Sequence, residues 1–184
     1  MDLTTQVAVT AIIRRQFNGV RKYLLLQRAA SKKLWPNLWT LPGGHVDTQD
    51  YEGVEANAEN IRYGVLENAL RREVWEEAGI NIKNIEFLTS MFFQHKENML
   101  VMSMLADQYG DGEVKINSES QDFGWFDVLQ VQELATIDGI YEEISAAEYG
   151  SFNFPSYSYN DHFYRARAAK EKFLQLIKTG ETTI

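Results

Sequence analysis

The segment Arg72–Ile80, with the sequence REVWEEAGI, places three glutamates close together on a predicted helix. Residues three or four positions apart share one helix face, so Glu73, Glu76 and Glu77 would form a single acidic stripe. Like charges at this spacing repel each other, whereas a bound divalent cation would make the same arrangement favourable. Clustered carboxylate oxygens suit Mg²⁺ or Mn²⁺. An acidic, solvated helix face is the alternative interpretation, because Glu-rich helices are common.

Two neighbouring features favour the metal site. A strand-like stretch leads into the sequence LPGGHV at Leu41–Val46, and Gly79 follows the acidic helix as a C-terminal stop. Together these residues resemble the Nudix box, the motif of hydrolases that act on nucleoside diphosphates linked to another group. The box reads G-x5-E-x7-R-E-U-x-E-E-x-G-U, where U is aliphatic. Its second half matches at Arg72–Ile80 and its opening matches at Gly43-Gly44.

The spacing between these two halves departs from the family pattern. About fourteen extra residues lie in the stretch from Asp47 to Tyr63, and counting back from Arg72 puts the first box glutamate at Gly64. The sequence therefore predicts that this glutamate is missing or is supplied by another residue. The polar composition of the insertion predicts a solvated loop, and its place beside the site would suit a lid or a specificity element.

The hydrophobic pattern around the box predicts an α/β fold. Asn18-Gly19 predicts a hairpin turn, and apolar residues at helical spacing before Ala78 predict a helix with one buried stripe. The predicted strands are Val7–Ile13, Tyr23–Arg28, Trp39–Leu41, Ile85–Phe93 and Met99–Ala106. The resemblance implies a Nudix-like α/β/α sandwich with a mixed β-sheet. We expect one Nudix-like hydrolase domain over residues 1–184, with a C-terminal helix at about 160–178.

The resemblance also implies a set of metal ligands. These are the carboxylates of Glu76 and Glu77 and the backbone carbonyl of Gly43, while Glu73 is either a further ligand or the catalytic base. The expected ion is Mg²⁺, with Mn²⁺ as the alternative. A side-chain-free turn would allow the Gly43 carbonyl oxygen to approach the ion closely.

Two further charged groups are candidates for catalysis. We expect Arg72 to orient the carboxylates through a charge-assisted fork, with an ordinary surface ion pair as the alternative. The family often takes another acidic residue from a distant loop. Glu119 and Asp122 lie in about the right region, and we favour Glu119 as the catalytic base. An exposed turn carboxylate is the alternative interpretation for both.

The function implied by the resemblance is Mg²⁺-dependent cleavage of a phosphoanhydride bond in a nucleoside diphosphate linked to another group. Several subfamily signatures are absent: no proline follows the box before Pro155, no tyrosine lies near position 97, and no coenzyme A signature precedes the box. The remaining expectation is a MutT-like pyrophosphatase that converts a nucleoside triphosphate into a monophosphate and pyrophosphate. A catalytically silent module that binds a nucleotide or sugar phosphate is the alternative, although retention of all three glutamates disfavours it.

Composition limits the partners. A net charge of −8 disfavours a nucleic-acid polymer or an anionic membrane, but a small phosphorylated substrate remains compatible because a bound cation reverses the local charge. The chain has no cysteine, which excludes disulfides and thiolate ligands. No apolar run is long enough to span a bilayer and no signal-like start is present, so we expect a cytoplasmic protein, as a monomer or homodimer.

Overall fold

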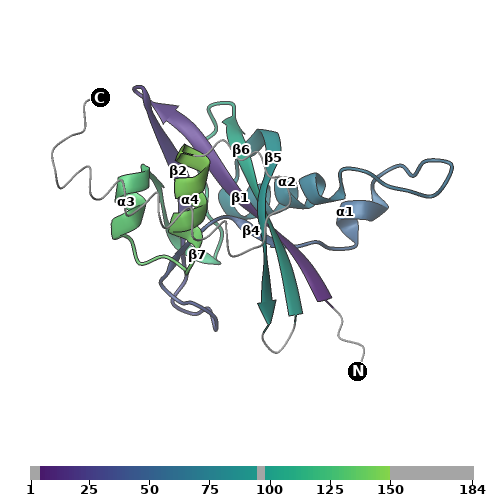
Figure 1. Ribbon diagram of the computed structural model, residues 1–184, viewed down its shortest axis with the longest axis horizontal. Coiled ribbons are helices and arrows are strands. Elements are labelled where there is room, and N and C mark those ends of the chain that lie inside the picture. Colours follow the sequence, from purple (N-terminus) through teal and green to yellow (C-terminus); the bar gives the residue numbers. More distant parts are fainter. Residues whose placement is uncertain (1–4, 95–97, 150–184) are drawn as a thin grey trace.

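The computed structural model describes residues 5–94 and 98–149 (Figure 1). The strands are β1 (Thr5–Phe17), β2 (Val20–Arg28), β3 (Trp39–Thr40), β4 (Gly43–His45), β5 (Asn81–Gln94), β6 (Asn98–Tyr109) and β7 (Ser120–Phe126). The helices are α1 (Gln49–Glu52), α2 (Val65–Ala78), α3 (Val128–Glu133) and α4 (Ile140–Tyr149). The predicted C-terminal helix at about 160–178 lies outside the described residues.

All seven strands belong to one mixed sheet. Its order is β3-β2-β1-β6-β5, with β4 added beside β1 and β7 beside β2. β1 runs parallel to β6, and the other strand pairs are antiparallel. The hairpin between β1 and β2 turns at Asn18 and Gly19, which both have positive φ (49° and 84°), as a tight hairpin turn of the favoured hand requires.

Helices cover both faces of this sheet. On one face, α2 buries Ala69, Leu70 and Val74 against the sheet in a core that includes Leu24 and Met104. On the other face, α3 and α4 contribute a second core cluster (Val128, Val131, Ile140, Tyr141, Ile144 and Ala147). Each large apolar side chain buried in this way stabilises the fold by about 1.5–3 kcal/mol. The predicted α/β/α sandwich with a mixed β-sheet is therefore confirmed.

The central strand β1 exchanges neighbours along its length, and this exchange positions the box. Near its end β1 pairs with β2, whereas Ala8–Thr10 pair with β4. Gly43 and Gly44 therefore lie in a short strand, and their prediction as a turn is wrong. A Cβ atom at Gly43 would lie 2.2 Å from the Val9 carbonyl oxygen, so this close approach of two backbones requires glycine.

Helix α2 is bounded by two glycines in the left-handed conformation. Gly64 precedes it with φ 75°, and Gly79 follows it with φ 65° and donates its N–H to the Trp75 carbonyl oxygen. These boundaries fix the register in which α2 presents its glutamates. Within the described ranges, no helix is both long and apolar enough to cross a membrane.

Candidate active site

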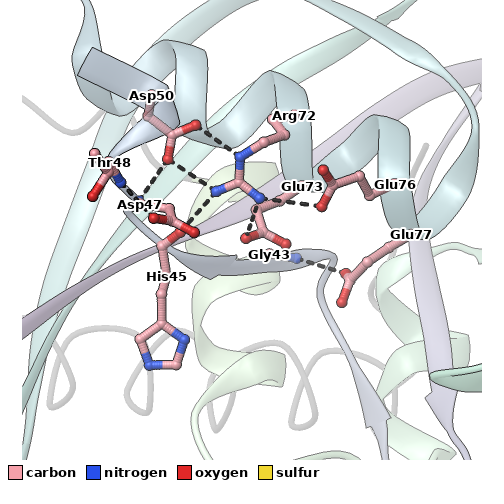
Figure 2. Close-up of polar contacts among 9 residues, drawn as sticks. All are labelled: Gly43, His45, Asp47, Thr48, Asp50, Arg72, Glu73, Glu76 and Glu77. Atoms are coloured by element: carbon pink, nitrogen blue, oxygen red, sulfur yellow. Dashed lines mark hydrogen bonds and ion pairs between the residues drawn. The ribbon is translucent and has the colours of Figure 1, made fainter. Parts of the chain in front are cut away.

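The acidic stripe of α2 faces the short strand β4, and Arg72 lies at its centre (Figure 2). The Arg72 guanidinium donates to the carboxylates of Glu73 (2.8 Å) and Glu76 (3.1 Å). It also donates to the backbone carbonyl oxygen of His45, at 2.9 Å. One arginine therefore joins the glutamates of α2 to the chain that carries the Gly-Gly sequence.

The strongest contact of Arg72 is with Asp50, which the sequence analysis did not single out. Nε and Nη2 of Arg72 donate to the two carboxylate oxygens of Asp50, at 2.7 and 2.9 Å. The side chain of Asp50 is only 2% exposed and that of Arg72 is 18% exposed. These hydrogen bonds raise the pKa of Arg72 and lower the pKa of Asp50, so the pair is fully ionised at neutral pH.

Asp50 also explains the apparent loss of the first box glutamate. Counting forward from Gly44, the pattern G-x5-E places that residue at position 50, where this chain has an aspartate. The expectation that the position falls at Gly64 is corrected, because the extra residues follow Asp50. Gly64 is the N-cap of α2. The forward count was available in the sequence.

Glu77 lies deeper than the other glutamates of the stripe. Its Oε2 accepts the backbone N–H of Gly43 at 2.9 Å. Burial raises the pKa of the Glu77 carboxyl to about 7, and the Gly43 N–H only partly opposes this effect. Burial also raises the pKa of Glu73, while Arg72 acts in the opposite direction. Both carboxylates would be stabilised by a nearby cation.

The two candidates for a distal base differ in their surroundings. Glu119 forms an ion pair with Lys32 at 2.5 Å, and its charge contributes to the raised pKa of Glu77. Asp122 lies in β7, where its carboxylate accepts the N–H of the next residue, Phe123. Glu119 is therefore the candidate that lies close enough to Glu77 to act on it electrostatically.

The donor set fits a hard divalent cation. Among the described residues, no three His, Asp or Glu side chains already converge as a metal-binding group, since Glu73 and Glu76 turn to Arg72 and Glu77 turns to Gly43. All donors are oxygens, which Mg²⁺ and Mn²⁺ prefer. Glycine at position 44 leaves space for the Glu73 carboxylate, because a Cβ there would lie 2.5 Å from it.

Comparison with known proteins gives the family directly. The NUDIX domain profile matches residues 4–147, which include the acidic helix, the Gly-Gly strand and the arginine that joins them. The chain belongs to the NUDIX family.

Relatives of known function match parts of the chain. The nucleoside triphosphatase NudI of Escherichia coli O139:H28 is 31% identical over 114 residues, which are 56% of this chain and 71% of the relative. The NAD-capped RNA hydrolase NudC of Vibrio atlanticus is 36% identical over 80 residues, which are 43% of this chain and 29% of the relative. The match thus spans less than a third of the NudC length.

Solved structures of low sequence identity share the fold. The NUDIX domain of Shewanella oneidensis NrtR, crystallised with ADP ribose, has a TM-score of 0.62 at 20% identity and covers 79% of this chain and 87% of its own. The C. elegans Ap4A hydrolase binary complex has a TM-score of 0.59 at 24% identity, and the match covers 78% of this chain and 95% of the hydrolase chain. These likenesses confirm the architecture around the site.

Proposed function

We propose that the protein is a divalent-metal-dependent hydrolase that cleaves a phosphoanhydride bond in a nucleoside diphosphate linked to another group. Nucleoside triphosphates, cleaved to monophosphate and pyrophosphate, are the favoured substrates. The observation that carries this proposal is the gathering of Glu73, Glu76 and Glu77 beside Gly43, with Arg72 bonded to two of them. The name of the NudI relative supports the same substrate class.

The glutamates of the stripe and the carbonyl oxygen of Gly43 would hold Mg²⁺, with Mn²⁺ as the alternative. When bound, the ion supplies neutralisation of phosphate charge and a lowered pKa for a bound water. Arg72 keeps Glu73 and Glu76 in place through charge-assisted hydrogen bonds. Asp50 in turn holds the guanidinium, so that Arg72 serves as a positioning residue.

Glu119 is the proposed general base. Its carboxylate would take a proton from the attacking water as the new P–O bond forms and the bridging P–O bond breaks, so that the leaving phosphate carries away the electron pair. Lys32 holds the Glu119 side chain at 2.5 Å, and this ion pair fixes the position of the carboxylate.

The test is a substrate panel with purified protein in Mg²⁺, Mn²⁺ or EDTA, read by chromatographic separation of the substrate from its phosphorylated products. The panel contains nucleoside triphosphates, ADP-ribose, nucleotide sugars, dinucleoside polyphosphates and an NAD-capped RNA oligonucleotide. We expect turnover only with a divalent cation and with a small nucleotide. Turnover in EDTA would refute the metal site, and cleavage of only the capped RNA would refute the substrate class.

Variants of the stripe test the residues. Glu76→Gln and Glu77→Gln should each lower kcat/KM by roughly a hundredfold or more. Glu67→Gln is the matched control, because Glu67 is an exposed glutamate in the first turn of α2. Equal activity of Glu76→Gln and Glu67→Gln would refute the ligand assignment. Nucleotide binding by the wild type without turnover of any substrate would favour the silent binding module instead.

A further inference from the structure

The loop between β2 and β3 (residues 29–38, called the 29–38 loop) carries a tryptophan in an unusual state. Trp35 is 43% exposed, and its backbone has φ 51°, in the left-handed region. Bulky residues rarely adopt this conformation, and exposure of an indole brings no gain from core packing. Such a combination of backbone strain and exposure is typical of residues retained for a function.

One side of the Trp35 ring is supported by another aromatic residue. The ring centroids of Trp35 and Phe93 are 6.0 Å apart with an interplanar angle of 53°, a favourable tilted arrangement. Phe93 is partly buried and belongs to β5, whose rigid pairing with β6 fixes its position. The indole therefore has a firm support while much of its surface stays in contact with solvent.

The 29–38 loop is closely cross-linked by hydrogen bonds. Arg28 donates its backbone N–H to Leu38 and its Nε to the carbonyl oxygen of Leu34, while Asn37 donates to Arg28. The Gln121 side chain of β7 also donates to Asn37. These bonds hold the residues on both sides of Trp35, so the indole is presented in a preorganised position and binding would order little chain.

This loop borders the candidate active site. Its Lys32 holds Glu119, the proposed base, and Ala29 donates its N–H to the Glu119 carbonyl oxygen. Trp35 follows Lys32 by three residues, which span at most about 11 Å, so it lies close to the pair formed by Lys32 and Glu119. A ligand whose reacting phosphate lies beside Glu119 would therefore have its far end within reach of Trp35.

We propose that Trp35 is the stacking platform for the nucleobase of the substrate. This inference rests on the proposed function, because it assumes that the phosphates lie at the glutamate stripe. Stacking accepts every purine and pyrimidine, since each has a flat π-face. The site would consequently select nucleotides over base-free polyphosphates while discriminating little among the bases.

The experiment compares two ligands that differ only in the presence of a nucleoside. Isothermal titration in Mg²⁺ measures Kd for a methylene-bridged, non-hydrolysable nucleoside triphosphate and for inorganic tripolyphosphate. Trp35→Ala should weaken nucleotide binding by about tenfold or more and change tripolyphosphate binding by less than about twofold. Trp35→Phe should restore most of the nucleotide affinity. Trp75→Ala, which removes another exposed tryptophan (58%) from α2, is the matched control and should bind both ligands normally.

Each result separates the possible roles of Trp35. Equal weakening of both ligands would show that Trp35 only maintains the loop, and unchanged nucleotide affinity in Trp35→Ala would also overturn the inference. Failure of the wild type to bind the nucleotide analogue would overturn it as well. Normal, Trp35-dependent nucleotide binding without hydrolysis of any substrate would refute the proposed function and leave the stacking platform intact.

Discussion

Replacing Asp50 with asparagine should destabilise the protein and impair its active site together. The substitution keeps the size of the side chain but removes its charge, and an amide N–H₂ cannot accept the two donors that Arg72 directs at the carboxylate. Asp50 is also tied to the backbone N–H of Asp47, a bond that one remaining oxygen can keep. The loss is therefore confined to the pair with Arg72.

The remaining contacts of Arg72 determine how much stability Asp50→Asn loses. Breaking a buried ion pair by removing one partner costs about 3–5 kcal/mol when the other charge is left unpaired. Arg72 keeps Glu73, Glu76 and the His45 carbonyl as acceptors, so its charge stays compensated. We therefore expect a smaller loss, about 2–3 kcal/mol in the free energy of unfolding. For a chain of this size the corresponding decrease in Tm is roughly 4–12 °C.

Thermal and urea unfolding in EDTA measure this loss without any contribution from a bound metal. Asp47→Asn is the matched control, because the Asp47 side chain is exposed and accepts a hydrogen bond from the backbone N–H of its neighbour, Thr48, rather than from Arg72. Asp50→Asn and Arg72→Gln should be strongly non-additive in the double variant, since both remove the same pair. A Tm for Asp50→Asn equal to that for Asp47→Asn would refute the reasoning, as would unchanged kcat in Mg²⁺.

Three further predictions follow from other parts of the structure. Burial raises the pKa of Glu143 from 4.5 to about 7, so the native state binds this proton more tightly than the unfolded chain and stability falls as the pH rises between these two values. Glu143→Gln cannot ionise, so over this interval its free energy of unfolding should fall by roughly 3 kcal/mol less than that of the wild type, as measured by urea unfolding at the two pH values. Gly43→Ala should lower the Tm strongly, because the added Cβ would collide with the backbone of β1. Gly44→Ala should keep the Tm and lower kcat, because its Cβ would displace the Glu73 carboxylate. Thermal unfolding followed by circular dichroism and turnover assays distinguish the two variants. A Gly-Ser linker in place of residues 54–62 should leave the Tm within a few degrees and change KM or substrate preference, and loss of folding would show that the segment is core structure.

Local sequence patterns predicted an element well where its structure depends on neighbouring residues in the chain. The Asn18-Gly19 turn and the acidic helix ending before Gly79 are encoded within a few residues, and both are found. The ends of strands are less well predicted, because they depend on partners elsewhere in the chain. β1 extends beyond the predicted Val7–Ile13 as far as Phe17, since its residues 14–17 pair with β2.

The features of the site that were missed depend on distant pairing. Gly43 and Gly44 read locally as a turn, yet their pairing with β1, more than thirty residues earlier in the chain, makes them a strand. The bond between Lys32 and Glu119 joins two loops that no spacing rule connects. The burial of Glu143 in α4 depends on packing against the sheet, and its hydrogen bond to Ser103 reaches across to β6.

The pair formed by Asp50 and Arg72 explains how the box tolerates the insertion. In the family pattern the first acidic residue and the arginine are eight positions apart, whereas here they are twenty-two positions apart, and the two side chains still meet at 2.7 Å. The segment between them forms internal hydrogen bonds; for example, the Asn57 side chain accepts the backbone N–H groups of Glu59 and Ile61. Because the entropy of closing a loop grows only logarithmically with its length, the extra residues add little cost once this pair forms. The constraint that the box imposes is therefore contact between a buried carboxylate and the arginine beside the glutamate stripe, and the number of residues between them can vary without moving either group.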